Sequence, residues 1–234
     1  MNINIYKTKE ELSDKLSDYI IQNHLNGSIA LSGGSTPLLL FKDLSKKLKE
    51  RRNLNTKFFW VDERCVPPES DESNYKMAKE NLFINNIFNS QNIFRIKGEI
   101  EPEKELINYN NILSENLLID KKIPSFDLII LGLGDDGHTA SLFPHEFLNF
   151  RDKEDCIIAS HPSSGQKRIS LSEKIINNAK EVIFHVTGAG KKYVIDEIIY
   201  NRGNYKSYPA SYINPKSNNL SWYLDFEASE MLTK

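Results

Sequence analysis

The segment LGLGDDGHT at residues 131–139 has the clearest catalytic potential, because it places one histidine after two aspartates in a glycine-rich stretch. A histidine beside a carboxylate is a common general base near neutral pH. We therefore take His138 as the candidate base and Asp136 as one carboxylate that could orient its ring. The other histidines lie in segments without catalytic or metal-type spacing and receive no chemical role: His24, His145, His161 and His185.

The segment SGGST at residues 32–36 has the composition of an anion-binding loop. Its glycines let backbone N–H groups turn toward a ligand, its hydroxyls add donors, and Pro37 marks the start of a helix whose N-terminus favours negative charge. A phosphate would fit such a loop. No Gly-Lys-Ser/Thr follows, so nucleoside triphosphate hydrolysis is not expected. The alternative is a tight turn with a hydroxyl cap and no ligand.

The 131–139 segment also spells G-x-G-x-x-G, the fingerprint of dinucleotide binding. We reject that interpretation. Asp135 and Asp136 would face a pyrophosphate, and Pro144 would cut short the helix that should supply the dipole. The segment is better described as an acidic loop that presents a histidine.

Two cations near predicted strand ends are candidates for holding a phosphate. Arg168 begins a strand-like stretch, and Lys191 closes the glycine-rich segment TGAGK at residues 187–191. A planar guanidinium fork and a compact ammonium charge both suit phosphate oxygens. Taken singly, each is more often a solvated surface cation.

Apolar strands and amphipathic helices alternate along the whole chain, and the polar segments follow the strands. Strands are predicted at residues 29–31, 58–61, 126–131 and 182–186, with helices at about 38–50, 74–87 and 101–118. Near-continuous apolar strands separated by helices indicate an α/β fold, with a mostly parallel sheet covered by helices on both faces. Ligands of such sheets bind beyond the carboxyl ends of the strands, where these polar segments are expected.

The composition is that of an ordinary globular protein, with 234 residues, 39% hydrophobic and 26% charged. A net charge of -2 gives no global field for nucleic acid or an anionic membrane, so we expect neither partner. Without a linker or internal repeat, residues 1–234 are predicted to form a single domain. Two distant cysteines and the lack of an export signal or membrane span predict a cytoplasmic protein.

Four segments, in this order, resemble the signature sequences of 6-phosphogluconolactonases: SGGSTP at 32–37, WVDER at 60–64, SNY at 73–75 and LGLGDDGHTASLFP at 131–144. The resemblance continues through 187–191, 208–211 and 222–225, and so covers nearly the whole chain. It implies a three-layer, Rossmann-like fold related to glucosamine-6-phosphate deaminase. It also implies a cofactor-free hydrolase that opens 6-phospho-D-glucono-1,5-lactone to 6-phosphogluconate in the oxidative pentose phosphate pathway.

Carried over position by position, the resemblance assigns the catalytic histidine to His138 and the sugar-facing residues to Asp62 and Arg64. The positions that bind substrate or phosphate fall on Gly33, Gly34, Ser35, Thr36, Asn74, Arg168 and Lys191. In chemical terms, His138 would take a proton from water and Arg64 would stabilise the oxyanion. Either Asp136 or Asp62 could orient the imidazole. We expect no metal, and the oligomeric state stays open between a monomer and a weak dimer.

Two alternatives belong to other functional classes. An amino-sugar-phosphate deaminase or isomerase would, by the same resemblance, carry a catalytic Glu directly before the proline, where this chain has Phe143. A phenyl ring cannot relay a proton. A non-catalytic sugar-phosphate sensor would need an output module, and no helix-turn-helix or basic arm is recognisable before residue 8.

Overall fold

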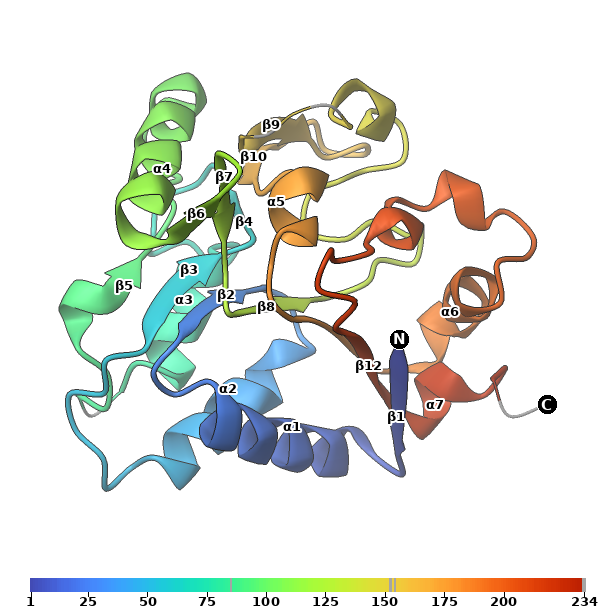
Figure 1. Ribbon diagram of the computed structural model, residues 1–234, viewed down its shortest axis with the longest axis horizontal. Helices are drawn as coiled ribbons and strands as arrows, with labels where there is room; N and C mark the ends of the chain where they lie inside the picture. Colours follow the sequence, from blue (N-terminus) through green and yellow to red (C-terminus); the bar gives the residue numbers. More distant parts are fainter. Residues whose placement is uncertain (85, 152, 154, 233–234) are drawn as a thin grey trace.

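A central parallel sheet organises the computed structural model, which describes residues 1–84, 86–151, 153 and 155–232. Its strand order is β1-β12-β11-β8-β2-β3-β5, and neighbouring strands within the described residues pair in parallel (Figure 1). The strands are β1 (Asn2–Tyr6), β2 (Ser28–Leu31), β3 (Lys57–Trp60), β5 (Ile93–Phe94), β8 (Leu128–Leu131), β11 (Val182–Val186) and β12 (Leu220–Asp225). The α/β class with a mostly parallel sheet is confirmed.

Helices cover both faces of this sheet. In Figure 1, α1 and α2 lie below it, and α4 and α5 lie above it. The helices are α1 (Lys9–Asn23), α2 (Pro37–Lys47), α3 (Asn74–Asn81), α4 (Pro102–Asn116), α5 (Glu173–Asn177), α6 (Lys192–Ile199) and α7 (Phe226–Ser229). The helix predicted over 74–87 therefore ends early. Phe83 and Phe88, which lie beyond its end, pack edge-on against Phe58 of β3.

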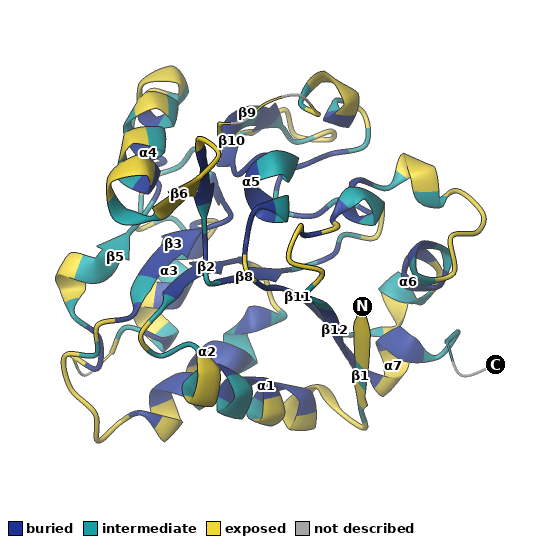
Figure 2. Cartoon of the chain, in the orientation of Figure 1, coloured by how far each residue is buried: buried dark blue, intermediate teal, exposed yellow. Residues whose placement is uncertain are grey.

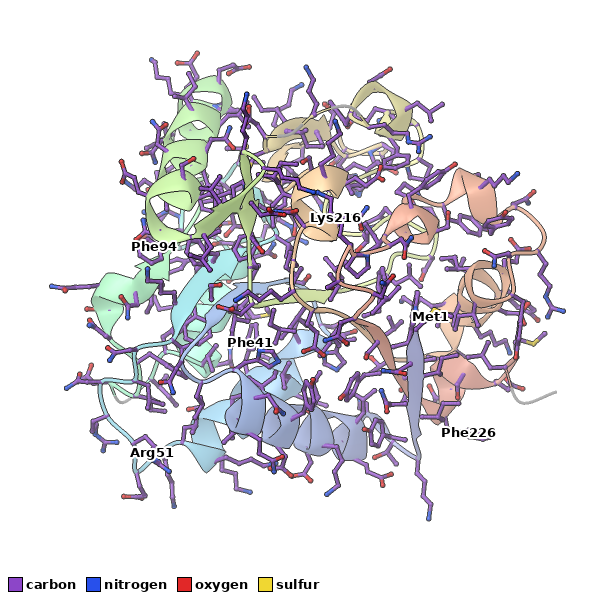
Figure 3. All side chains as sticks on the ribbon, viewed as in Figure 1. Met1, Phe41, Arg51, Phe94, Lys216 and Phe226 are labelled. Atoms are coloured by element: carbon purple, nitrogen blue, oxygen red, sulfur yellow. The ribbon has the colours of Figure 1, made fainter. Side chains whose placement is uncertain are left out.

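The apolar core lies between the sheet and these helices. Every residue of β2, β8 and β11 is buried, and Figure 2 shows the middle of the sheet in dark blue with exposed residues on outer helix faces and on β1. Figure 3 shows Phe41 among the side chains between α2 and the sheet, whereas Arg51 projects outward. Phe41 is only 1% exposed. The continuous apolar runs of the sequence are thus strands buried on both faces.

A smaller antiparallel sheet stands beside the main one and was not predicted from the sequence. It has the order β4-β10-β9, formed by β4 (Asp62–Arg64), β10 (Lys167–Ser170) and β9 (Ile157–Ser160). The chain passes from β3 into β4 at Val61, whose N–H donates to Leu31 and whose carbonyl accepts from Leu171. A short hairpin of β6 (Leu118–Asp120) and β7 (Ile123–Ser125) completes the sheets. The β4–β10 pairing is what brings residue 64 beside residue 168.

Candidate active site

A cavity of about 210 Å³ opens beyond the carboxyl ends of β2, β8 and β11, and it gathers the residues singled out from the sequence. Asp136 alone among them does not line it, and it instead binds the lining residue His138. The lining includes Gly33, Gly34, Ser35, Thr36, Asp62, Arg64, Asn74, His138, Arg168 and Lys191. Segments separated by more than a hundred residues therefore form one site, at the edge where parallel α/β sheets bind ligands.

His138 is held by a carboxylate of its own loop. Its Nδ1 lies 2.5 Å from Oδ1 of Asp136, and its backbone N–H donates to the same oxygen at 3.1 Å. Burial opposes ionisation of Asp136, but the contacts with His138 outweigh it and lower the pKa of Asp136. A carboxylate at Nδ1 favours the tautomer with the proton on Nδ1, which leaves Nε2 as the basic atom. Of the two carboxylates left open by the sequence, Asp136 contacts the imidazole.

The imidazole of His138 has two further close neighbours, Gly134 and Phe143. A Cβ atom added at Gly134 would lie 2.2 Å from Cε1 and Nδ1 of His138, so the ring occupies the space that a side chain would need. On another side the fully buried ring of Phe143 has its centroid 4.9 Å from that of His138. Its place before Pro144 is where the deaminase alternative required a carboxylate. These contacts leave the His138 ring little freedom to turn.

Two arginines face each other across the small sheet. Arg64 of β4 and Arg168 of β10 are direct cross-strand partners. Like charges in that position repel. Burial lowers the pKa of Arg168, and the charge of Arg64 adds to this, while Asp62 at 3.9 Å opposes it. The Nε atoms of both arginines are buried without a hydrogen-bond partner within the described residues. An anion in the cavity would relieve both the repulsion and the missing hydrogen bonds.

Asp62 lies at the base of this arginine pair. The residue is 5% exposed, and its Oδ2 accepts a hydrogen bond from the Ser141 hydroxyl at 2.6 Å. Its backbone carbonyl accepts from Nδ2 of Asn74 at 2.9 Å. Asp62 therefore fixes β4, the histidine loop and α3 relative to one another. Ser141 was missed in the sequence, although it lies three residues after His138 within the LGLGDDGHTASLFP segment.

Glu63 is a second residue that the sequence did not single out. Its carboxylate accepts backbone N–H groups of Asn74 and Tyr75, each at 2.8 Å, and so binds the N-terminus of α3. Burial raises the pKa of Glu63, although these backbone hydrogen bonds oppose the rise. The arrangement presses Asn74 against the first glycine loop, where a Cβ atom at Gly33 would lie 1.7 Å from Oδ1 of Asn74. Glycine is therefore required at position 33 because any side chain there would collide with Asn74, in addition to any need of a ligand for close access to the backbone.

The loop at residues 32–36 and the loop after β11 are joined at the other end of the cavity. The Oγ1 atoms of Thr36 and Thr187 lie 3.2 Å apart. Gly34 has a φ of +93°, a conformation that favours glycine. Lys191 reaches the same end of the cavity, and its Nζ lies 3.0 Å from Oδ1 of Asp135. Hydroxyls, a glycine loop and an ammonium group thus surround one region.

His185, which received no role from the sequence, also lines the cavity. It lies on β11, is 2% exposed, and has a buried Nδ1 atom without a hydrogen-bond partner in the described part of the chain. Burial lowers the pKa of His185 to about 3, so its ring is neutral. The available signal in the sequence was a lone histidine in an otherwise apolar strand that leads into TGAGK.

Comparison with known proteins identifies the class. The sequence model of glucosamine-6-phosphate isomerases/6-phosphogluconolactonases matches residues 5–222, and the chain belongs to this family. Within it, the 6-phosphogluconolactonase of Haemophilus influenzae is 43% identical over 239 residues, covering 99% of this chain and 100% of that protein. The human 6-phosphogluconolactonase is 30% identical over 243 residues, covering 99% and 93%. These relatives place the chain in the 6-phosphogluconolactonase group of enzymes.

Solved structures agree with this placement. The devB protein superposes with a TM-score of 0.89 at 37% identity, covering 98% of each chain. The 6-phosphogluconolactonase from Trypanosoma brucei gives 0.88 at 29% identity, covering 99% of this chain and 98% of that one. A monomeric glucosamine-6-phosphate deaminase shares the fold, with a TM-score of 0.81 at 17% identity over 99% and 100% of the two chains.

The described residues contain no group of three or more His, Cys, Asp or Glu side chains placed to hold a metal ion. The helices among them are all too short or too polar to cross a membrane.

Proposed function

We propose that the chain hydrolyses 6-phospho-D-glucono-1,5-lactone to 6-phosphogluconate, as a step of the oxidative pentose phosphate pathway. The observation that carries the proposal is His138, held by Asp136 at 2.5 Å, which lines the same cavity as the facing arginines 64 and 168. This combination supplies a base and an anion site to one small ligand. The 6-phosphogluconolactonase relatives support the same substrate.

In the proposed reaction His138 acts as the general base. Its Nε2 atom takes a proton from a water molecule, and the water oxygen bonds to the lactone carbonyl carbon. The carbonyl electrons move onto oxygen, where the guanidinium of Arg64 stabilises the negative charge. When the oxyanion collapses, the bond between the carbonyl carbon and the ring oxygen breaks. His138 then returns the proton to that ring oxygen, and the product is an open-chain acid.

A second group of cavity-lining residues would bind the phosphate. The loop of Gly33, Gly34, Ser35 and Thr36 offers backbone and hydroxyl donors, while Arg168 and Lys191 offer charge. The phosphate does not react, so binding it accelerates the reaction by fixing the carbonyl near His138. Asp62 and Asn74, which also line the cavity, would face the sugar hydroxyls.

We further propose that residues 1–234 form one domain. The first strand, β1, pairs along its whole length with β12 near the end of the chain, so both ends belong to one sheet. We also propose that the protein acts in the cytoplasm, where its two free cysteines, Cys65 and Cys156, would stay reduced.

The test is a turnover assay with freshly generated δ-lactone, coupled to oxidation of the product and corrected for spontaneous hydrolysis. We expect rapid turnover by the wild-type protein, and background rates with a folded His138→Ala variant. Glucosamine 6-phosphate serves as the substrate of the deaminase alternative, and we expect no turnover of it. Binding of 6-phosphogluconate without lactone turnover would instead support the sensor alternative.

A further inference from the structure

His185 is a buried imidazole that the proposed reaction does not use. The other residues of β11 are Val182, Ile183, Phe184 and Val186, so the histidine interrupts an apolar strand. It lines the cavity, yet its Nδ1 atom is buried without a hydrogen-bond partner in the described part of the chain. Buried polar atoms are nearly always paired, and an unpaired one calls for an explanation.

His185 lies near the part of the cavity where we place the phosphate. Thr187 follows β11 directly and lies two residues after His185, the spacing that places side chains on one face where the chain stays extended. The Thr187 hydroxyl lies 3.2 Å from that of Thr36, in the loop where we place the phosphate. Lys191 follows in the same loop after β11 and also lines the cavity. His185 therefore lines the cavity together with residues that we place around the phosphate, Thr36 and Lys191.

The chemistry of a neutral imidazole suits that place. The ring carries one N–H donor and one bare nitrogen. A buried N–H without an acceptor is rarer than a buried acceptor without a donor, so the unpartnered Nδ1 favours the tautomer with the proton on Nε2. In that form the ring can donate one hydrogen bond from Nε2 without adding a charge to the interior. A phosphate oxygen is a strong acceptor for such a donor.

We propose that His185 is a further substrate-binding residue, whose Nε2–H donates a hydrogen bond to a phosphate oxygen of the bound sugar phosphate. This inference deepens the proposed function of the same cavity and rests on it. The competing explanation is that His185 only fills space between β11 and the helices. The two differ in whether the ring responds to a phosphate group.

Binding measurements separate these explanations. His185→Leu keeps the approximate volume but removes the donor, whereas His185→Gln keeps an N–H donor near the Nε2 position. We expect His185→Leu to raise the Kd of 6-phosphogluconate and the KM of the phosphorylated lactone by roughly three- to tenfold, with kcat within about twofold of wild type. His185→Gln should recover most of the affinity. Ile183→Val, on the same face of β11 but away from the cavity lining, is the packing control and should leave both constants unchanged.

Nuclear magnetic resonance of wild-type protein labelled with ¹⁵N-histidine gives a readout that needs no substitution. We expect the His185 ring in the Nε2–H tautomer, with a resonance that moves on addition of 6-phosphogluconate but not of gluconate. The proposal would be overturned if the resonance did not move on addition of 6-phosphogluconate. It would also be overturned if His185→Leu raised the KM of phosphorylated and unphosphorylated lactone equally. Failure of the proposed function is distinct, because it appears as absent lactone turnover by the wild-type protein, whatever the behaviour of His185.

Discussion

Asp136 binds His138 twice through one oxygen, since Oδ1 lies 2.5 Å from the ring Nδ1 and accepts the backbone N–H at 3.1 Å. Both residues belong to the loop after β8, so the orientation of the imidazole depends on a contact within that loop. The glycine at position 134 allows the ring to lie against the backbone. The proposed base and the carboxylate that contacts it therefore form a local unit, whereas Arg64 and Arg168 belong to the small sheet.

Removing the imidazole should abolish most of the catalysis. We expect His138→Ala to lower kcat by about a hundredfold or more, the usual scale for loss of a general base, with a smaller change in KM. The coupled lactone assay measures both constants, and a thermal melt verifies folding. Activity within about threefold of wild type in the folded variant would remove His138 from the mechanism.

The two carboxylates near the site should have different effects. Asp136 contacts the imidazole, whereas Asp62 accepts from Ser141 and lies near Arg168. We expect Asp136→Asn to lower kcat by about tenfold or more with little change in KM, and Asp62→Asn to act mainly on KM. Steady-state kinetics give kcat and KM of both variants and so show which carboxylate orients His138. The reverse pattern would mean that Asp62 orients the base.

The close contact at Gly134 predicts a large effect from one methyl group. In Gly134→Ala the new Cβ atom would lie 2.2 Å from Cε1 and Nδ1 of His138, so the ring must move. We expect kcat to fall by about tenfold or more. Gly132→Ala in the same loop tests only added bulk in the cavity, because Gly132 lines it and its Cβ atom would meet no protein atom within 4 Å. A kcat of Gly134→Ala within about twofold of wild type would show that the ring position is not critical.

The effect of removing either proposed phosphate-binding cation should depend on whether the substrate carries a phosphate. We expect Arg168→Ala and Lys191→Ala each to weaken binding of the phosphorylated lactone by roughly 1.5 to 3 kcal/mol. The effect should largely vanish with unphosphorylated gluconolactone. Lys180→Ala is the control, because Lys180 pairs with Asp127 away from the cavity lining. If the substitutions weaken binding of both lactones equally, these cations act on the fold or on the chemistry instead.

The carboxyl group of Asp127 predicts how the stability of the fold depends on pH. Burial opposes its ionisation, but hydrogen bonds from Lys180 and Ser28 outweigh burial and lower its pKa below the ordinary 3.8. A carboxyl whose pKa is lower in the folded state stabilises the fold above its unfolded pKa and loses this contribution as pH falls through the folded pKa. Thermal melts of wild type and Asp127→Asn should therefore differ most above about pH 5 and converge below pH 3.8. A gap that stays constant down to pH 3 contradicts the assignment.

Much of the central sheet could be predicted because a continuous run of apolar residues is a local feature of the sequence. Residues 29–31, 58–61, 126–131 and 182–186 are continuous apolar runs, and the structure has β2, β3, β8 and β11 there. β1 and β12 were missed. In β1, exposed Ile3 and Ile5 alternate with polar Asn residues on an edge strand, so no continuous apolar run marks it. Its place follows from pairing with β12, more than two hundred residues later.

The sequence by itself determined which residues are candidates for the chemistry, because glycine, histidine and arginine types and their order along the chain are visible in it. It also determined the α/β class, since apolar runs and helical periodicity are local properties. Only the tertiary structure decided that Asp136 rather than Asp62 contacts His138, that Arg64 faces Arg168 and that His185 lines the cavity. Those relationships depend on loop conformation and on strand register between segments about a hundred residues apart. Packing of the whole chain sets that register, and no single segment encodes it.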